Sequence, residues 1–445
     1  MSKVVVIGGG VVGLCVALMC AEKGHCVVVV ERGAADRDEG CSFANAGMVV
    51  PSHVVPLASP GMVALGLRWM WKPESPFHLK PRASVDLLGW GWKFWRACTR
   101  EHVRRAAPLL RDLHLASRTF YEQWTAHWDE PFAFVESGML VLCNTEHGLE
   151  EEAQAAAFAR DLGVPAEVLT PKQVAGIEPD IRLSITGAVH FPRDARLVPA
   201  QLMRALQKET QRRGVEVRCG IDVRAFRTHG SRIDAVETSD GVVAGDEFVL
   251  AAGVWSSQLA RKLGLSLPMQ SGKGYSLTVE KPPATMRTCA ILSEARAAVT
   301  PMGTALRYGG TMEITGLDEA IEPVRIRGIV KAMHDYFPDV TPNLFATAAI
   351  RAGLRPCSPD GLPYIGRFAR YANLSAATGH AMMGVSLAPV TGMLLAQVLS
   401  GEATSIAIDA LSPDRYASPR NVSDLPSLVT RSASDARATR VRPGV

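Results

Sequence analysis

The stretch KVVVIGGGVVGLCVALMCAEKGHCVVVVE, residues 3–31, decides the fold of this chain. Residues 4–7 form a short β-branched run, which is typical of a buried parallel strand, and residues 26–30 form a second one. A glycine-rich turn and an apolar helix lie between them, and Gly24 is a plausible helix stop. This order of strand, turn, helix and strand predicts a parallel α/β unit.

The first turn of this unit has the spacing GxGxxG. Gly8 allows a sharp turn, Gly10 lets the backbone approach a pyrophosphate, and Gly13 lets the helix pack closely on the strand. Phosphates would lie at the amino end of the helix, where free N–H groups favour negative charge. Glu31, at the end of the second strand, can accept hydrogen bonds from a ribose. We therefore expect a dinucleotide, and its place at the amino terminus of a long chain favours FAD over NAD.

Composition bounds the class of protein. The chain has 445 residues, 47% of them hydrophobic, and a formal net charge of +4, which suits a large core in two or three domains. It has no basic stripe with interleaved aromatic residues, so we expect no nucleic-acid partner. Nine cysteines without a CxxC pair favour a reducing compartment and predict neither a disulfide framework nor a metal site.

Membrane and export signals are weak in this sequence. No cleavage site of the signal type follows the first apolar stretch, and we expect no run to approach the roughly 18 apolar residues of a membrane span. We expect a cytoplasmic protein, either soluble or attached peripherally to the inner face of the cytoplasmic membrane. Five of the eight tryptophans gather in residues 55–77 and 87–95, where core packing, a lid, a quinone-side surface and a membrane-facing patch all stay open.

The middle of the chain predicts two kinds of sheet. Residues 32–47 are polar and turn-rich; Ser42 and Asn45 could donate to phosphate or ribityl oxygens, and Gly47 permits close approach, although an ordinary surface loop is an alternative. Residues 197–213 predict a helix, and residues 215–250 a small β-meander followed by a buried strand. Residues 268–345 predict an antiparallel sheet, and the tail 417–445 predicts disorder.

The stretch GLRPCSPDGLPYIG, residues 353–366, carries a charge in a run of glycine, proline and apolar residues. We interpret the run as tight turns joining buried strands. A buried charge is costly without a partner, and the planar fork of Arg355 matches the two oxygens of a carboxylate. That carboxylate could belong to a substrate or to a structural acid such as Asp360.

Taken together, these motifs resemble the D-amino-acid oxidase and glycine oxidase superfamily of FAD-dependent amine oxidoreductases, and most nearly the bacterial D-amino-acid dehydrogenases. The stretches that carry the resemblance are VVVIGGGVVG, GCSFANAGMVVPS, PGMVALGLRWM, KGYSLT, GLRPCSPDGLPYIG and TGHAMMGVSLAPVTG. The resemblance implies a Rossmann-like FAD-binding domain of the glutathione-reductase type, made of residues 1–50, 196–265 and 345–416. Residues 51–195 and 266–344 would form an α+β substrate domain on an antiparallel sheet.

The resemblance also implies site residues. Arg355 would hold the substrate carboxylate, Met48 and Met312 would line the substrate cavity, Tyr275 could add a hydroxyl, and His380 would lie near the flavin. The implied cofactor contacts are Gly8, Gly10, Val12, Gly13, Glu31, Arg32, Ser42, Asn45, Ala46, Gly47, Met48, Val223, Ala252, Gly253, Trp255, Gly353, Gly379, Met383, Gly384, Val385 and Ser386.

Departures from the family pattern refine these expectations. Relatives that tether FAD through a cysteine carry it where Gly353 stands here, so Cys357 is expected to be a packed small residue and FAD to be non-covalent. Relatives that act on glycine have a basic residue where Met382 stands and a tyrosine near Ala298. The less polar pocket expected here favours a bulkier or cyclic side chain.

The expected reaction is dehydrogenation of a D-amino acid, such as D-proline, D-hydroxyproline or D-alanine. Hydride would pass from the substrate Cα to flavin N5 and leave an imino or keto acid. An oxidase or demethylase of N-methyl amines is an enzymatic alternative, and a flavin-bearing assembly factor is a non-enzymatic one. The electron acceptor could be a quinone or an electron-transfer protein, and an oligomer stays open.

Overall fold

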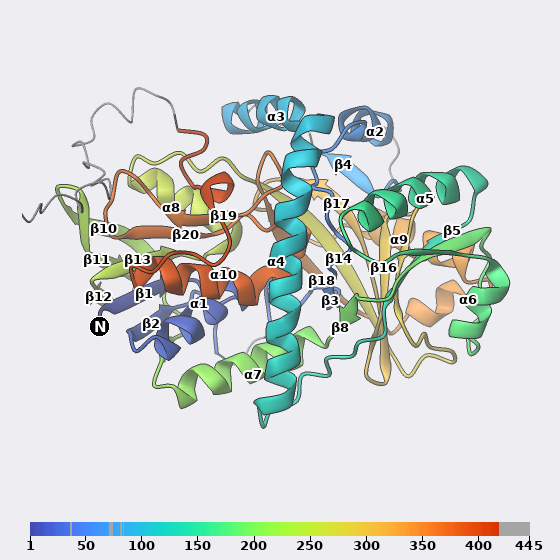
Figure 1. Ribbon diagram of the computed structural model, residues 1–445, viewed down its shortest axis with the longest axis horizontal. Helices are drawn as coiled ribbons and strands as arrows, with labels where there is room; N and C mark the ends of the chain where they lie inside the picture. Colours follow the sequence, from blue (N-terminus) through green and yellow to red (C-terminus); the bar gives the residue numbers. More distant parts are fainter. Residues whose placement is uncertain (36–37, 71–73, 81, 83, 418–445) are drawn as a thin grey trace, which may run out of the picture.

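The computed structural model describes residues 1–35, 38–70, 74–80, 82 and 84–417. Figure 1 shows two sheets side by side, with a long helix, α4 (Arg100–His127), running between them. The predicted disordered tail, residues 417–445, lies outside the described residues apart from Ala417.

The six-stranded sheet contains the strands that the opening motif predicts. Its strands are neighbours in the order β19 (Tyr364–Arg367), β20 (Leu374–Thr378), β13 (Glu247–Leu250), β1 (Lys3–Ile7), β2 (Cys26–Val30) and β9 (Glu216–Arg218). All neighbours are parallel except β19 and β20. Both predicted opening strands are therefore confirmed, together with the parallel α/β class.

The two faces of this sheet are covered differently. Successive residues of a strand point to opposite faces. Val4 and Val6 join a core cluster with helices α1 (Val11–Glu22), α7 (Pro199–Arg212) and α10 (Gly384–Leu399). Val5 and Ile7 pack against helix α8 (Ser256–Lys262) and a meander of β10 (Val223–His229), β11 (Arg232–Thr238) and β12 (Gly241–Ala244). The predicted meander is confirmed.

The second sheet has nine strands in the described part of the chain. The main path is β18 (Ala349–Cys357), β14 (Gln270–Glu280), β17 (Ala305–Ile314), β16 (Ala297–Met302), β15 (Cys289–Leu292), β5 (Met139–Cys143), β7 (Gly187–Phe191) and β6 (Glu167–Leu169). Strand β4 (Phe77–Leu79) pairs with β17. The strands of residues 268–345 pair antiparallel with one another as predicted. The pairs β15–β5 and β17–β4 are parallel, so the sheet of the whole predicted substrate domain is mixed and not purely antiparallel.

The helices beside this sheet are α5 (Glu146–Asp161), α6 (Pro171–Ile177) and α9 (Pro323–Tyr336), and a short ladder joins β3 (Met48–Val49) to β8 (Ala195–Arg196). The strands of the six-stranded sheet fall within the predicted FAD-binding segments. Strand β18 also falls there, but it joins the other sheet. The domain limits themselves stay a prediction.

Strand β18 corrects the interpretation of residues 353–366. Gly353, Arg355 and Pro356 lie within the strand, and the turn begins only after Cys357. β18 is the edge of its sheet, and an edge strand tolerates proline because one side of it needs no backbone donor. Pairing with β14, from Gln270 opposite Cys357 onward, overrides the local turn propensity.

Helix α10 corrects the expectation that no apolar run approaches a membrane span. In the described residues, 381–399 form a stretch of 19 residues with a mean hydropathy of 1.6, long and apolar enough to cross a membrane. Most of this stretch is buried inside the protein, where α10 packs in one core cluster with α1. Its composition fits a core helix as well as a span.

The tryptophan-rich region forms helices α2 (Met62–Trp69) and α3 (Val85–Ala97) and leads into α4. Helix α4 is about 42 Å long, at a rise of 1.5 Å per residue. The Tyr121 hydroxyl of α4 donates to the carbonyl of Val385 at the start of α10, at 2.6 Å. Trp90 and Trp124 are buried, so core packing accounts for part of the region, while Trp92 and Trp95 are exposed.

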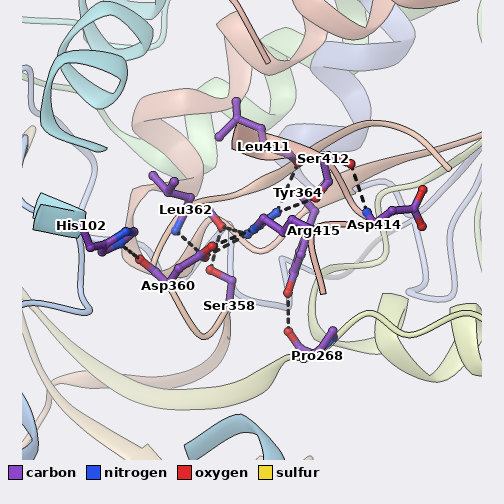
Figure 2. Close-up of polar contacts among 10 residues, drawn as sticks. All are labelled: His102, Pro268, Ser358, Asp360, Leu362, Tyr364, Leu411, Ser412, Asp414 and Arg415. Carbon is purple, nitrogen blue, oxygen red and sulfur yellow. Dashed lines mark hydrogen bonds and ion pairs between the residues drawn. The ribbon is translucent and has the colours of Figure 1, made fainter. Parts of the chain in front are cut away.

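An ion pair closes the carboxyl end of the fold. Figure 2 shows the Arg415 guanidinium donating to both carboxylate oxygens of Asp360, at 2.7 and 2.9 Å. The guanidinium also lies 3.8 Å from the ring centre of Tyr364, whose hydroxyl donates to the carbonyl of Pro268. Burial acts to raise the pKa of Asp360, but Arg415 outweighs it and the pKa is lowered. Asp360 therefore has a structural partner, and the alternative that it pairs with Arg355 is wrong.

We expect the substitution Arg415→Met to destabilise the protein by about 3 kcal/mol near neutral pH, because it leaves a buried carboxylate without its partner. The lowered pKa means that the ionised carboxylate contributes stability above its unfolded pKa and loses it as the pH falls. The gap in Tm between wild type and variant should therefore shrink towards pH 3, as measured by calorimetry. The double variant with Asp360→Asn should recover part of the loss; a gap that widens in acid would contradict this assignment.

Candidate active site

A cavity of about 790 Å³ follows the carboxyl ends of the parallel strands. It begins among the glycines after β1, passes Glu31 and Ser42, and reaches Leu354, Pro356 and Ala381. In open α/β sheets, ligands bind outside the carboxyl ends of the strands. The cavity has enough volume for a dinucleotide, and its lining extends along the ends of the strands as a dinucleotide would.

The glycine turn is a cradle in which side chains have no room. Gly8 has φ +110°, and an added Cβ would lie 2.5 Å from the carbonyl oxygen of Ala251. At Gly13 an added Cβ would lie 1.9 Å from the carbonyl oxygen of Gly8, so the helix is pressed against the turn. Gly10 is the N-cap of α1. The N–H groups of the first turn of α1 therefore open towards the cavity, as an anion site requires.

Glu31 lies at the end of β2, at the wall of the cavity. Its two carboxylate oxygens accept hydrogen bonds from the N–H groups of Gly9 (2.5 Å) and Gly33 (2.6 Å), which fixes the carboxylate beside the glycine turn. Arg32 follows, and its guanidinium lies 4.2 Å from the ring centre of Trp255 across the cavity wall. This end of the cavity combines a carboxylate acceptor with a cation and an aromatic face.

The polar loop after β2 is held by a residue that the sequence interpretation missed. The Arg307 guanidinium of β17 donates to the carbonyls of Phe43 (2.9 Å) and Asn45 (2.7 Å). Burial, together with a smaller effect of the Arg351 charge, lowers the pKa of Arg307 to about 10. Ser42 in this loop accepts from the N–H of Val11 at 3.0 Å. The loop is thus a fixed wall and not an ordinary surface loop.

The end of this loop, residues 45–47, turns tightly and leaves no room for a side chain at Gly47. The side chain of Asn45 accepts from the N–H of Gly47 at 2.8 Å. Gly47 has φ +72°, and an added Cβ would lie 2.2 Å from the carbonyl oxygen of Leu197. Ala46 and Met48 then pack in a cluster with Ala298 beside the larger sheet.

The amino end of α10 forms the other wall. Gly384 and Val385 line the cavity, and His380 and Ala381 precede them. His380 is buried and its Nε2 lies 2.9 Å from the Thr391 hydroxyl. Burial lowers the pKa of His380 to about 3, so its imidazole is neutral near physiological pH. His380 is therefore suited to packing and hydrogen bonding at this wall and not to proton transfer.

A buried polar network supports this helix end from behind. The Ser386 hydroxyl accepts from the N–H of Val50 (3.0 Å) and lies 2.8 Å from Nδ1 of His114 on α4. His114 also contacts the Met383 sulfur at 3.4 Å. Ser386 and Met383 thus position the start of α10 and lie outside the cavity lining.

The predicted cofactor contacts divide into two groups. Those that line the cavity are Gly8, Gly10, Val12, Glu31, Arg32, Ser42, Asn45, Val223, Ala252, Gly253, Trp255, Gly384 and Val385. Those that lie behind its walls are Gly13, Ala46, Gly47, Met48, Gly353, Gly379, Met383 and Ser386. Gly353 is close-packed, since an added Cβ would lie 3.1 Å from the Cα of Cys41, and Gly379 has φ +81°.

Arg355 is half-buried on β18, opposite Gly272 of β14. Its Nη1 donates to the carbonyl of Thr311 at 2.8 Å. Across the described residues, no carboxylate lies within ion-pair distance of its guanidinium. Arg355 is therefore a cation next to the cavity wall that has most of its hydrogen-bonding capacity available.

Two backbone features make room for this arginine. The register of β14 against β17 shifts between Lys273 and Tyr275, so β17 carries a bulge at Thr311, which has φ +68°. The bulge turns the Thr311 carbonyl towards the guanidinium. An added Cβ at Gly274 would lie 2.1 Å from both Nη1 and Nη2 of Arg355, so the guanidinium rests directly on the glycine.

An apolar wall adjoins the arginine. Cys357 is fully buried in a cluster with Trp90 and Ala381, against which Met312 packs. The indole N–H of Trp90 donates to the carbonyl of Cys357 at 2.9 Å. The expectation that Cys357 is a packed small residue is confirmed, and burial raises the pKa of its thiol to about 12. Met312 is thus on the same wall as Arg355, while Met48 lies in a separate cluster.

Tyr275 does not reach this region. Alternation along β14 turns it away from the face that Gly274 and Arg355 share. It packs with Leu277 in the core of the larger sheet, and its hydroxyl donates to the carboxylate of Glu313 at 2.5 Å. The prediction that the Tyr275 hydroxyl lies near the pocket is not supported by this placement, because β14 alternates without a shift against β18 and turns residue 275 to the face opposite Gly274.

Of the two functional residues that the sequence interpretation missed, Arg307 has a signal in the sequence and Thr311 has none. Arg307 lies in the strand pattern ALRYGG at a position that alternation turns inward, and an inward arginine needs acceptors. Thr311 has no comparable signal, because its left-handed backbone follows from pairing with a distant strand.

A glycine cradle at the start of a parallel sheet, an acid at the end of the next strand and a meander on one face define a flavin- or nicotinamide-dinucleotide enzyme. The family model of FAD dependent oxidoreductases matches residues 3–398, and the chain belongs to this family. It is an FAD-dependent oxidoreductase with a Rossmann-like cofactor domain.

Relatives with known names indicate which enzymes of this family the chain is similar to. The chain is 34% identical over 426 residues to a D-amino acid dehydrogenase of Methylobacterium nodulans, covering 93% of this chain and 99% of that protein. A D-amino acid dehydrogenase of Bradyrhizobium diazoefficiens is 32% identical over 424 residues, with the same coverage. Among solved structures, glycine oxidase from Geobacillus kaustophilus has a TM-score of 0.75 at 23% identity, covering 94% of this chain and all of that one. This structural likeness shows the fold.

Proposed function

We propose that this protein is a dehydrogenase of D-amino acids that uses non-covalent FAD and prefers an apolar or cyclic substrate such as D-proline, D-hydroxyproline or D-alanine. The observation that carries the proposal is Arg355, a half-buried cation beside the cavity whose guanidinium donates to the Thr311 carbonyl and, among the described residues, has no carboxylate within ion-pair distance. Relatives at 32–34% identity named D-amino acid dehydrogenases support the substrate class.

The chain has groups suited to each part of FAD. The N–H groups at the start of α1 would hold the pyrophosphate, and the Glu31 carboxylate would accept the ribose hydroxyls. The start of α10 would lie at the ring end, where its dipole favours negative charge. When bound, FAD supplies the two-electron oxidant for the carbon–nitrogen bond of the substrate.

The protein's own part in the reaction is orientation. The guanidinium of Arg355 binds the substrate carboxylate through two parallel N–H donors, and Thr311 and Gly274 hold that guanidinium in place. The substrate amine must be neutral to release its α-hydrogen with the bonding electrons. His380 is neutral and already bonded to Thr391, so amine deprotonation is left to solvent.

The wall beside Arg355 suits an apolar side chain. Met312, Trp90, Cys357 and Ala381 present no charge to this region. A hydrophobic side chain that leaves water for this wall gains about 25 cal/mol for each Å² buried. The wall therefore favours a compact apolar substrate over glycine, which has no side chain to bury.

We expect the flavin to leave the protein when the denatured enzyme is precipitated with acid. Cys357 is fully buried with a raised thiol pKa, and burial also raises the pKa of Cys41, against a lowering by Arg355, so both thiols stay protonated. Absorbance of the supernatant near 450 nm measures the release. Yellow colour that stays in the washed pellet, and is lost in Cys41→Ser, would instead show a covalent link.

The direct test is a panel of D- and L-amino acids assayed with a dye acceptor. We expect turnover of D-proline, D-hydroxyproline or D-alanine above that of glycine and sarcosine, and none of the L-isomers. Release of formaldehyde from N-methyl substrates would favour a demethylase. Turnover of L-isomers alone, or a flavin that no amine reduces, would contradict the proposal.

A further inference from the structure

Helix α3 exposes an apolar stripe that no described residue covers. Its outward side chains are Val85, Leu88, Trp92 and Trp95, with exposed fractions of 87%, 74%, 58% and 55%. Their spacing of three, four and three residues places all four on one face of the helix. The rings of Trp92 and Trp95 touch, with centroids 5.0 Å apart. Isolated exposed apolar residues are ordinary, whereas a continuous stripe marks a contact surface.

The other face of the same helix packs on the candidate site. Trp90 stacks on Phe94 with ring centroids 5.0 Å apart, and its indole donates to the Cys357 carbonyl of β18. The Ser84 side chain caps the helix by accepting from the N–H of Leu87 at 3.3 Å. Helix α3 is therefore apolar on two faces, and within the described part of the chain the inner one alone is covered by apolar side chains.

The segment of sequence that contains the stripe is basic. Residues 61–105 contain nine Lys or Arg and three Asp or Glu. Asp86 is paired with Arg261 at 2.7 Å and Glu101 with Arg105 at 3.5 Å, so two of the three acids are neutralised. Arg96 is exposed and is the i+4 neighbour of Trp92, so it lies at the margin of the stripe.

Shape favours a lipid surface over a protein partner. Figure 1 shows α3 at the upper edge of the molecule, outside both sheets. Thirteen residues form a ridge about 20 Å long and one side chain wide, which is small for a stable protein interface of about 800 Å² on each side. A protruding ridge of Leu and Trp bordered by cations fits the boundary between headgroups and acyl chains.

We propose that α3 binds the surface of an anionic membrane through Val85, Leu88, Trp92 and Trp95, with the basic residues around it contacting lipid headgroups. The stripe would enter the interface by about 5–10 Å without crossing the bilayer. Because the inner face of α3 forms part of the wall beside Arg355, the membrane contact lies next to the candidate active site. This membrane contact does not depend on the proposed reaction.

The test is co-sedimentation of the full-length, FAD-loaded protein with vesicles of phosphatidylcholine alone or mixed equally with phosphatidylglycerol. We expect the wild type to sediment with the mixed vesicles and to be released by salt, because screening weakens the basic contacts. The double variant Trp92→Ser/Trp95→Ser should bind at least about tenfold more weakly, since two large apolar contacts are lost.

A matched control removes two exposed apolar side chains elsewhere. Val168 on β6 and Val242 on β12 are each 47% exposed, so Val168→Ser/Val242→Ser should bind vesicles like the wild type. Bound-flavin absorbance and Tm should be the same in all three proteins, which shows that they are folded. Wild-type protein that stays in the supernatant, or a tryptophan variant that binds equally well, would overturn the proposal. So would a wild-type dimer in ultracentrifugation that the tryptophan variant converts to monomer, because a second copy would then cover the stripe.

Discussion

Arg355→Lys is expected to raise the KM for the D-amino-acid substrate by about 30- to 1,000-fold while FAD stays bound. The guanidinium offers a planar pair of donors to a carboxylate, whereas an ammonium is a single point charge. Losing one or two charge-assisted hydrogen bonds costs about 2–4 kcal/mol, and each 1.4 kcal/mol is a factor of ten. Steady-state kinetics with a dye acceptor measures the effect.

The control is Arg227→Lys, because Arg227 is an exposed residue of β10 that pairs with Glu237 far from the cavity. Its kinetics should match those of the wild type. Flavin content is measured in parallel, since Arg355 lies beside the cavity wall and not in the glycine cradle. Unchanged KM and kcat in Arg355→Lys would remove this residue from substrate binding.

Gly274→Ala is expected to lower kcat/KM by a similar factor, although residue 274 touches no substrate in our proposal. The new Cβ would stand 2.1 Å from two guanidinium nitrogens, so Arg355 must leave its place. The guanidinium would lose its contact with the Thr311 carbonyl, and a misplacement near 1 Å can cost about 100-fold in rate.

A double-mutant cycle separates this effect from general damage. If Gly274→Ala acts by displacing the guanidinium, it should have little further effect on kinetics in the Arg355→Lys background. Gly176→Ala is the matched control, because no atom lies within 4 Å of an added Cβ there. Additive losses in the double variant, with a falling Tm, would show that Gly274 supports only the fold.

The cofactor half of the molecule could be predicted because its signals are local. The strands of residues 4–7 and 26–30, the glycines between them and Glu31 all lie within one short stretch. Steric constraints at Gly8 and Gly13 act between residues that are close in sequence or at the same sheet edge. Sequence periodicity and turn chemistry therefore suffice there.

The substrate half could be predicted only in part because its geometry is non-local. Residues 353–357 have the composition of a turn, yet they form an edge strand paired with a segment about 80 residues earlier. The uninterrupted register of β14 against β18 places Arg355 and Gly274 on one face and Tyr275 on the other, while the bulge at Thr311 of β17 brings a carbonyl to the guanidinium. A one-residue shift in register exchanges such faces, and composition does not encode it.

The partner of Asp360 shows the same limit. Arg355 and Asp360 are neighbours in sequence, but the carboxylate binds Arg415, which lies 55 residues further along the chain. The nearer arginine is directed along the sheet towards Gly274 by strand pairing. The separation of these two charges leaves Arg355 available for a ligand.

The central claim is that Arg355 recognises a carboxylate and thereby orients the amine for oxidation. The most direct measurement is the rate of flavin reduction in anaerobic stopped flow, comparing D-proline with pyrrolidine, which is the same ring without the carboxylate. We expect D-proline to bleach the flavin at least about 100-fold faster in the wild type, and this difference to collapse in Arg355→Lys. Equal reduction of the wild type by both amines would contradict the claim.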